Sequence, residues 1–378
     1  MKLIHLSDLH LGKRLNEFSL LEDQKFILIK ILNIIDGEKP DAVLIAGDVY
    51  DKSVPSAEAV EVFDDFLVRL AERKLQVFVI SGNHDSPERL AFGGRLMDAS
   101  GVHLAPVYKG HVEPITLQDS FGPVHIYMLP FVKPSHVRRF FPEEEIGSYT
   151  DALGVTIEDM KRNDNERSVL IAHQFVTGAD RSESEEVSVG GLDNVDVAVF
   201  EGFDYVALGH IHGPQNISEN IRYCGTPLKY SFSEAKHEKS VTVVELGEKN
   251  ALTVRTVPLI PLHDMVELRG HYEELMSRSF YENTTYQTDY VHITLTDEAD
   301  VPEALARLRV VYQNLMKLSY DNTRTRHASQ TDGVEDMEAK APMEVFAEFY
   351  EKQNGVPLTE EQETLLQGLI EKIWEGEA

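Results

Sequence analysis

The stretch LIHLSDLHLG, residues 3–12, passes from a run of apolar residues into side chains that can bind a metal ion. Lys2–Ser7 reads as a buried strand, and Asp8 and His10 follow it directly. The same order of strand and polar motif recurs twice in the first hundred residues. The second expected strand, Asp41–Ala46, is followed by Gly47-Asp48, and the third, Gln76–Ser81, is followed by Gly82-Asn83-His84-Asp85.

Helix-like segments separate these three strands. Phe18–Ile35 and Ser56–Arg73 carry apolar residues at helical spacing, and Pro87–Ala99 has proline at its first position. Strands that alternate with helices in this way imply parallel βαβ units. We therefore expect an α/β fold.

From about Gly101 the pattern changes to short strands that alternate apolar and polar residues, interrupted by one helix-like stretch at Asp151–Arg162. Two of these strands end in histidines. His173 closes Ser168–Ala172, and Gly209-His210-Ile211-His212 closes Tyr205–Leu208. The other expected strands are Val112–Leu117, Val124–Leu129, Ser240–Glu245 and Leu252–Val257.

The five motifs should converge, because ligands in α/β sheets gather outside the carboxyl ends of the strands. Carboxylates, imidazoles and a side-chain amide suit manganese, iron or zinc. A carboxylate can bridge two cations, and Asp48 is the natural bridge. Two cations about 3.5–4 Å apart can acidify a shared water and stabilise charge on a phosphoryl group. Each motif alone is common in turns or cores, but the five in this order predict a two-metal phosphoesterase.

These motifs resemble the calcineurin-like metallophosphoesterase signature. The resemblance implies a four-layer α/β/β/α sandwich, in which two sheets are flanked by helices. It also implies two divalent metal ions, with Mn²⁺ the expected ion. The implied ligands are Asp8, His10, Asp48 and His212 for the first metal, and Asp48, Asn83, His173 and His210 for the second.

The residues around the motifs narrow the resemblance to the SbcD nucleases. It rests on LIHLSDLHLG at 3–12, IAGDVYD at 45–51, ISGNHD at 80–85 and YCGTPLKYSFSE at 223–234, and it spans essentially the whole chain. It implies an exonuclease on duplex DNA ends and an endonuclease on hairpins and single strands. Such an enzyme works with an SbcC-type ATPase in DNA repair, recombination and replication.

Two other functions are weighed against this one. The first is a phosphatase or phosphodiesterase that acts on a small nucleotide or a phosphoprotein. Protein Ser/Thr phosphatases would carry an Arg-Gly pair where this chain has Lys52-Ser53, so that branch is disfavoured. The second is a DNA-tethering subunit without catalysis, and the intact ligand set speaks against it.

His84 follows the expected ligand Asn83 immediately, so it should face the substrate without binding metal. We expect it to stabilise the transition state or to protonate the leaving oxygen. Asp51 is expected to orient His84 through a hydrogen bond.

The formal net charge of −28 argues against unaided DNA binding, which usually needs a basic footprint. DNA would then be held by a local basic patch, by bound metal or by a partner. The single cysteine, Cys224, excludes an intrachain disulfide and fits a reducing cytoplasm, with the nucleoid as the expected place of work and no membrane span. The candidate phosphate contacts are Lys13, Arg14, Arg89, Lys133, Arg138, Arg139 and Arg181.

Four units are expected along the chain. Residues 1–260 form the nuclease domain, 261–322 a small α+β capping domain that binds DNA, 323–340 a polar linker and 341–378 a helical motif that binds the ATPase subunit. The capping domain should contain a strand at Asp289–Thr296 and a helix at Pro302–Leu318. In the helical motif, Thr359–Gln362 is a capping box. The apolar residues expected to bind the partner are Phe346, Phe349, Leu366, Leu369, Ile370 and Ile373.

The Ser56–Arg73 helix has an apolar arc wider than one stripe. Burial in the core is one explanation, and contact with a second copy of the chain is the other. The family resemblance implies a homodimer through this helix and the next. The residues expected in that interface are Val62, Phe63, Phe66, Leu67, Leu90 and Leu96.

Overall fold

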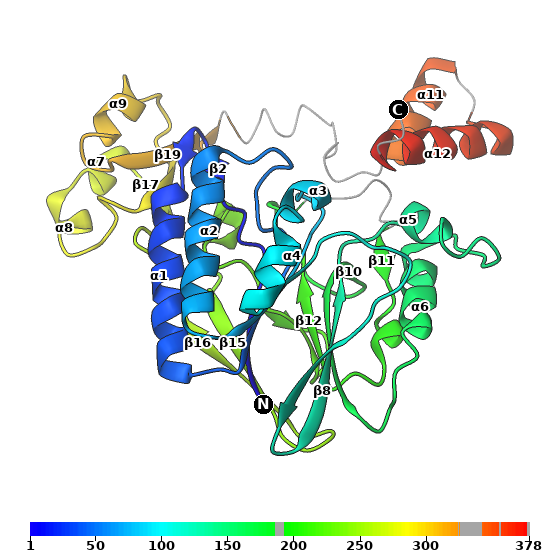
Figure 1. Ribbon diagram of the computed structural model, residues 1–378. Coiled ribbons are helices and arrows are strands. Elements are labelled where there is room, and N and C mark those ends of the chain that lie inside the picture. The colour runs from blue at the N-terminus through cyan, green and yellow to red at the C-terminus, as the bar shows by residue number, and fades with distance from the viewer. Residues whose placement is uncertain (186–192, 324, 326–341, 355–356, 376–378) are drawn as a thin grey trace.

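The computed structural model describes residues 1–185, 193–323, 325, 342–354 and 357–375 (Figure 1). Two six-stranded sheets face each other in the body of the molecule. The first has the order β16 (Leu252–Pro258), β15 (Ser240–Leu246), β1 (Lys2–Leu6), β4 (Ala42–Ala46), β5 (Gln76–Ile80) and β6 (Val102–Ala105). The second has the order β13 (Gln215–Asn216), β14 (Ile221–Tyr223), β12 (Tyr205–Gly209), β9 (Arg167–His173), β8 (Gly122–Leu129) and β7 (Ile115–Asp119).

Helices cover the outer faces of both sheets and complete the expected four layers. The helices α1 (Leu21–Glu38) and α2 (Ala57–Glu72) lie over the first sheet, and α5 (Pro134–Arg138) and α6 (Tyr149–Asp159) lie over the second (Figure 1). Side chains alternate along the strands between the two sides. In β4, Val43 and Ile45 join the core under α1 and α2, whereas Leu44 and Ala46 join the core between the sheets. The α/β/β/α architecture is confirmed.

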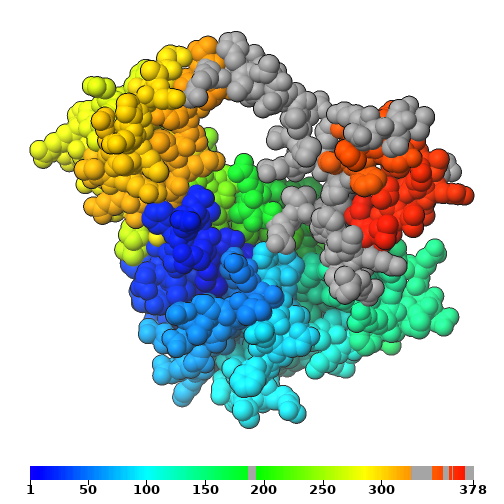
Figure 2. All heavy atoms as spheres, turned by 90° about the horizontal axis from the view of Figure 1, so that it is seen from above, coloured from blue at the N-terminus to red at the C-terminus, as the bar shows by residue number. Residues whose placement is uncertain are grey.

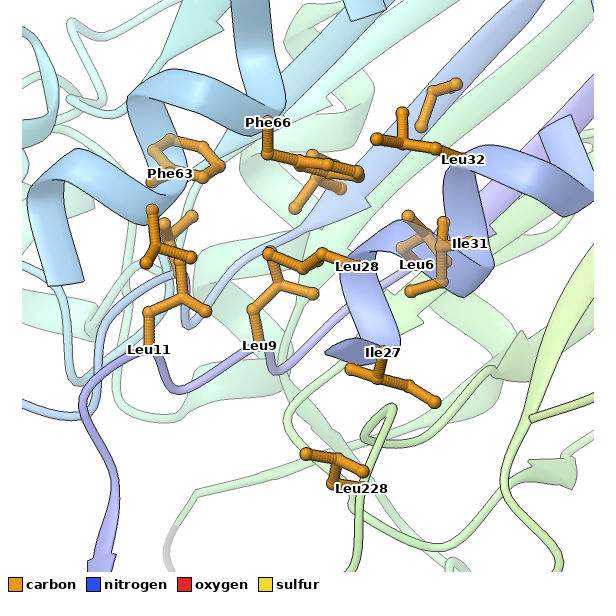
Figure 3. Close-up of a cluster of buried hydrophobic side chains, with 14 of the residues drawn as sticks. Leu6, Leu9, Leu11, Ile27, Leu28, Ile31, Leu32, Phe63, Phe66 and Leu228 are labelled. Atoms are coloured by element: carbon orange, nitrogen blue, oxygen red, sulfur yellow. The ribbon is translucent and has the colours of Figure 1, made fainter. Parts of the chain in front are cut away.

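The core under α1 and α2 also includes the first metal-binding loop. Figure 3 shows Leu9 and Leu11, which flank His10, packed among Leu28 of α1 and Phe63 and Phe66 of α2. Both leucines are buried. The backbone around His10 is thereby anchored by apolar side chains on either side of it, which leaves the imidazole little freedom to move.

The strands that carry the motifs are parallel and in register at their carboxyl ends. Within the first sheet, Leu6 pairs with Ile45, and Ala46 pairs with Ile80. Within the second, Gly209 pairs with His173. The loops that follow these pairs therefore begin at the same edge of each sheet, and both edges lie at the same end of the sandwich (Figure 1).

Shorter elements connect the layers. The helical turns α3 (Pro87–Leu90) and α4 (Gly94–Met97) replace the single helix expected at Pro87–Ala99, because Gly93 adopts a φ of 76° between them. Two small strand pairs are formed by β2 (Arg14–Leu15) with β3 (Phe18–Ser19), and by β10 (Phe175–Val176) with β11 (Asn194–Val195). The 3₁₀ turns are η1 (Asp98–Ser100), η3 (Val197–Phe200) and η4 (Phe232–Glu234).

A separate parallel sheet follows the body, with the order β17 (Met265–Gly270), β18 (Tyr290–Leu295) and β19 (Asn314–Tyr320). It has its own buried cluster, which includes Leu275, Ile293 and Tyr312. We call this part, residues 265–320, the cap. Figure 2 shows it in yellow and orange beside the first residues of the chain in blue. The short helices of the cap are α7 (Tyr272–Leu275), α8 (Arg278–Tyr281) and α9 (Ala304–Leu308).

The expected helix at Pro302–Leu318 is wrong beyond Leu308. Its second half instead forms β19, which pairs with β18 and buries Leu315 and Met316. Local spacing of apolar residues cannot reveal this pairing, because the partner strand lies more than twenty residues earlier in the chain. The strand expected at Asp289–Thr296 is present as β18.

The tail contains α11 (Pro342–Asn354) and α12 (Glu360–Glu375). The predicted capping box before α12 is formed: the backbone N–H of Thr359 donates to Gln362 Oε1, and the backbone N–H of Gln362 donates to Thr359 Oγ1. Most of the expected linker, 323–340, lies outside the described residues. Among the helices of the described ranges, none has the length and apolar character that crossing a bilayer requires.

A cavity of about 500 Å³ lies at the junction of body and cap, lined by residues that include Leu228, Lys229, Pro261, Met265 and Tyr290. None of the expected metal ligands lines it.

Candidate metal centre

The seven expected metal ligands come from five strand ends and meet in one place. Asp8 and His10 follow β1, Asp48 follows β4, Asn83 follows β5, His173 ends β9, and His210 and His212 follow β12. Three groups of possible ligand atoms form there, and within each group the atoms lie within 4.8 Å of one another. The groups are Asp8, His10 and His212; Asp8, Asp48 and His173; and His10, Asp48 and His84.

Asp48 lies between the two halves of this cluster. Its Oδ2 atom is 3.6 Å from His10 Nε2 on one side and 3.3 Å from His173 Nε2 on the other. Its Oδ1 atom accepts a hydrogen bond of 2.9 Å from the backbone N–H of His84. One carboxylate oxygen therefore faces donors on both sides, as a ligand shared by two cations must.

On one side of Asp48, three donor atoms converge on a small space. The Oδ1 atom of Asn83 lies 3.0 Å from His173 Nε2 and 3.0 Å from His210 Nδ1. The other ring nitrogen of His173, Nδ1, donates to the carbonyl oxygen of Ala46 at 2.8 Å. This bond fixes the tautomer that leaves Nε2 unprotonated and available to a cation.

On the other side of Asp48, two imidazoles face each other. His10 Nε2 and His212 Nε2 are 3.1 Å apart, and both rings are buried. His10 Nδ1 is buried without a hydrogen-bond partner. Two buried nitrogens that point at each other beside Asp8 and Asp48 are poorly satisfied by the protein alone, and a divalent cation would satisfy them.

The backbone of the motif loops is unusual. Asp8, His10, Asp48 and His210 all have positive φ values, of 51°, 43°, 47° and 103°. Residues other than glycine adopt such angles at a cost of about 1–3 kcal/mol each, and they gather at functional sites. The loops are tied together by backbone bonds from Asp8 N–H to Gly47 oxygen and from His10 N–H to Asp48 oxygen, both 3.0 Å.

Glycines in the motifs allow these loops to approach one another. A Cβ atom on Gly82 would lie 2.0 Å from Asp48 Oδ1, and one on Gly209 would lie 1.9 Å from the carbonyl oxygen of Ala46. Neither position can hold a side chain unless the backbone moves. The Gly-Asn-His-Asp and Gly-His-x-His motifs therefore need glycine for steric reasons, in addition to the ligands that follow it.

Burial governs the charges in the site. It raises the pKa of Asp8 to about 6, and the nearby charge of Asp48 adds to the rise. Burial also lowers the pKa of His10 and of His210 well below the usual value, so both rings are neutral, the form that binds metal. Burial alone would lower the pKa of His173, but the charge of Asp48 at 3.3 Å outweighs it and raises this pKa to about 9.

His84 differs from the expected ligands in exposure. Its side chain is 15% exposed, against 0% for His173 and 3% for Asp48. Its Nδ1 atom donates to the carbonyl oxygen of Asp51 at 3.1 Å, and its Nε2 atom lies 4.0 Å from Asp48 Oδ2. The backbone of Asp51 thus orients His84, whereas the Asp51 carboxylate forms an ion pair of 2.8 Å with Lys13.

Several residues that support the site were not selected from the sequence. The carboxylate of Asp85 accepts hydrogen bonds from the backbone N–H groups of Val49, Tyr50 and Gly82, and so joins two of the motif loops. Gln24 on α1 donates to the carbonyl oxygen of His10 at 2.7 Å. Asp85 belongs to a motif that the sequence displays, but nothing near Gln24 in the sequence indicates its role.

The candidate DNA contacts differ in how available they are. Lys13 is paired with Asp51, and Arg181 is paired with Asp193 at 3.2 Å and stacks on the ring of Phe175. Arg14 donates to the carbonyl oxygen of Glu17. Lys133 is partly buried, and the exposed candidates are Arg89, Arg138 and Arg139.

Most residues expected in a dimer interface belong to the core of the chain itself. Val62, Phe63, Phe66 and Leu67 pack under α2, and Leu90 joins the same cluster. Leu96 alone among the six is exposed, at 82%, beside Phe92 at 86%. The wide apolar arc of α2 is therefore explained by the core, and an interface could use only Leu96 of the predicted set.

The expected partner-binding residues in the tail are more exposed. Phe346, Phe349 and Leu369 have exposed fractions of 42%, 59% and 46%. Leu366 and Ile370 are partly buried, and the side chain of Ile373 lies outside the described residues.

Comparison with known proteins supports the same chemistry. A family model described as Calcineurin-like phosphoesterase matches residues 1–214, and one described as Type 5 capsule protein repressor C-terminal domain matches residues 261–354. The chain is 32% identical to a protein from Staphylococcus epidermidis that is named as the SbcD component of the nuclease SbcCD, over 100% of both chains. It is also 32% identical to the protein of that name from Staphylococcus saprophyticus, over 99% of both.

Similarity to solved structures is more distant. A dimetal phosphatase from Danio rerio matches with a TM-score of 0.39 and 11% identity, covering 68% of this chain and 96% of that one. The argument for divalent metals rests instead on the phosphoesterase family and on the grouped carboxylates and imidazoles of this chain.

Proposed function

Because the chain belongs to the calcineurin-like phosphoesterase family and, along its whole length, to the SbcD nucleases, we propose that it is a DNA nuclease that hydrolyses phosphodiester bonds with two divalent metal ions. The observation that carries the proposal is the position of Asp48, whose Oδ2 atom faces donors on both sides. A single metal would need no such shared oxygen.

The contacts support a division of the ligands between two ions. Asp8, His10, Asp48 and His212 would hold the first, and Asp48, Asn83, His173 and His210 would hold the second. Mn²⁺ is the ion we propose, because a mixed set of oxygen and imidazole donors suits it. When bound, the two ions would acidify a water molecule and draw negative charge from the phosphoryl oxygens.

His84 would complete the site from the substrate side. The carbonyl oxygen of Asp51 accepts only from an N–H group, so Nδ1 of His84 carries a proton. A second proton on Nε2 makes the ring an imidazolium, which can donate to the leaving oxygen or stabilise charge on the phosphoryl group. Asp51 acts in this scheme as a positioning residue through its backbone.

The proposed substrates are duplex DNA ends, which the enzyme would cut as an exonuclease, and hairpins and single strands, which it would cut as an endonuclease. The work would serve DNA repair, recombination and replication, on the chromosome in the cytoplasm. The relatives are named as one component of a two-part nuclease, so a second component is part of the proposal. We propose that an SbcC-type ATPase binds the tail helices and grips DNA that a chain of net charge −28 would otherwise repel. A homodimer remains part of the proposal, with Leu96 as its candidate contact.

The test separates metal binding from chemistry. Replacement of His84 by alanine should leave Mn²⁺ binding within about twofold of the wild type while cleavage falls by about 10²-fold or more, since an acid–base group contributes on that scale. Binding would be measured by calorimetry, and cleavage with linear duplex DNA, a DNA hairpin and a chromogenic phosphate ester. His111→Ala, which removes an exposed histidine paired with Asp159, is the matched control.

Two results would contradict the proposal. If His84→Ala lost the metals together with activity, His84 would not have the separate role described here. If the wild-type protein cleaved the phosphate ester but neither DNA substrate, the small-substrate hydrolase would replace the nuclease.

A further inference from the structure

A buried polar cluster lies behind the imidazole of His212. The Nε2 atom of this ring faces His10 Nε2, so Nε2 points into the metal site. The Nδ1 atom points away from it, 2.7 Å from the hydroxyl of Ser184 and 3.3 Å from Oε1 of Glu234. An imidazole that binds a cation through Nε2 carries its proton on Nδ1, and that proton needs an acceptor.

Glu234 is the acceptor to which this cluster leads. Its side chain is fully buried, and the hydroxyl of Ser184, which can accept from His212, donates in turn to Oε1 of Glu234. The ammonium of Lys239 contacts Oε2 at 2.5 Å, and it also donates to Thr226 Oγ1 at 2.7 Å. A buried carboxylate paired in this way stays charged, and a charged carboxylate is a strong acceptor for an imidazole N–H.

The turn that carries Glu234 also touches the cap. The backbone N–H of Glu234 donates to the carbonyl oxygen of Ser231 at 3.0 Å, which closes the 3₁₀ turn η4. The ring of Phe232 in this turn lies against the ring of His292 on β18, with centroids 5.3 Å apart, and η4 packs against β17. A movement of the cap against Phe232 would therefore be felt two residues later at Glu234.

We propose that Glu234 is a positioning residue for His212, and that η4 couples the position of the cap to the affinity of the first metal ion. The inference rests on the proposed two-metal function. It assigns no chemistry to Glu234 itself, which acts only through the orientation and the proton of the His212 ring. The second metal ion has no ligand in contact with this cluster and should not respond to it.

The first experiment titrates Mn²⁺ into the metal-free full-length protein and follows the heat of binding. The double variant Glu234→Gln/Lys239→Met removes the carboxylate without leaving a buried unpaired ammonium, which could itself unfold the protein. We expect two ions to bind the wild type, and one of the two to bind the variant about 10–100-fold more weakly, as loss of such a partner usually does. The matched control is Glu238→Gln, an exposed glutamate in the same loop.

Thermal unfolding without metal shows whether the variant is folded at the titration temperature, and Glu234→Asp, which keeps the charge, should recover part of the affinity. If the folded double variant binds both ions as the wild type does, the inference is wrong. If the wild type binds fewer than two ions, the proposed function fails instead.

The second experiment tests the coupling to the cap. Phe232→Ala removes the ring that meets His292 and leaves Glu234 in place. It should weaken the same ion by roughly two- to tenfold, the range in which residues that couple two regions act. The control is Phe280→Ala, which removes a ring that packs on Tyr286 elsewhere in the cap. Equal affinities in the wild type and both variants would overturn the coupling.

Discussion

At the scale of single residues, the metal centre is a problem of buried charge. Asp8 and Asp48 are both buried, and two carboxylates in a low-dielectric site repel each other. The site answers this with imidazoles around Asp48 and with backbone N–H groups, such as that of His210, which donates to Asp8 at 3.0 Å. Two divalent cations would neutralise what remains, which explains why so many ionisable groups are packed where a core would otherwise be.

Another buried histidine, His5, makes the stability of the fold depend on pH. It lies between the hydroxyl of Tyr205 at 2.8 Å and the carbonyl oxygen of Leu208 at 3.2 Å. Burial lowers its pKa to about 3, and the charge of Arg222 adds to the effect. Below a pH of about 6.5 the unfolded chain binds a proton that the folded chain refuses, so stability falls as the pH drops from about 6.5 toward 3.

Replacement of His5 by leucine should weaken this dependence. The free energy of unfolding at pH 7.5 should fall by about 1–3 kcal/mol, because the Tyr205 hydroxyl loses its partner. The difference between the values at pH 7.5 and pH 5, measured by urea denaturation, should nevertheless be smaller than in the wild type. An equal or larger difference would show that His5 is not kept neutral by burial.

At the scale of elements, the strand ends decide which side chains meet. The sequence was sufficient to place Asp8, Asp48 and the Gly82–Asp85 motif after strands, because apolar runs followed by polar motifs are local patterns. It could not indicate Gln24 or Glu234, which come from a helix and a 3₁₀ turn and reach the site only through tertiary contacts. For the same reason the strand β19 was mistaken for a helix.

The close approach of the loops after β4 and β5 gives a steric prediction. Gly82→Ala would place a Cβ atom 2.0 Å from Asp48 Oδ1 and 2.5 Å from the Asp48 nitrogen. We expect a loss of stability of about 1–3 kcal/mol, as for other overpacked sites, and weaker binding of both metal ions. In contrast, Gly37→Ala on α1 meets nothing within 4 Å and should stabilise the protein by about 0.5–1 kcal/mol. Thermal unfolding and Mn²⁺ titration of both variants would check this, and an unaffected Gly82→Ala protein would refute the close contact.

The tail helices give a second prediction at this scale. A chain that ends before Ala341 should keep its metal-dependent cleavage of DNA but lose its complex with the ATPase subunit. The substitution pair Phe346→Ala and Phe349→Ala should weaken that complex too, since both rings are exposed apolar groups in α11. Val310→Ala, which removes an exposed apolar side chain of the cap, is the control. Co-purification with the ATPase subunit is the measurement, and a truncated chain that still binds it would exclude the tail.

At the scale of the whole molecule, the net charge of −28 sets the conditions for any contact with DNA. Cations at the metal centre and a few exposed arginines are the local exceptions to an acidic surface. Much of the four-layer architecture was predictable, because alternating strands and helices define it. The relation of the cap to the body was not, since it depends on contacts such as Tyr290 of β18 with Asp23 of α1, whose partners lie far apart in the chain.

The exposed arginines can be tested by their effect on the salt dependence of DNA binding. Combined replacement of Arg89, Arg138 and Arg139 by alanine should reduce the slope of log K against log salt by about 0.9 for each phosphate contact that is lost from duplex DNA. Arg69→Ala, which removes an arginine paired with Asp65 on α2, should leave the slope unchanged. Fluorescence anisotropy with labelled duplex DNA between low and moderate salt is sufficient. An unchanged slope in the triple variant would reject these residues as phosphate contacts.

The central claim is that five strand ends hold two cations that share the Asp48 carboxylate. Anomalous diffraction from crystals soaked in Mn²⁺ measures this directly. The account predicts two peaks about 3.5–4 Å apart, one on each side of Asp48, with His10 and His212 at the first and Asn83, His173 and His210 at the second. A single peak, or a pair of peaks that do not share Asp48 as a ligand, would contradict it.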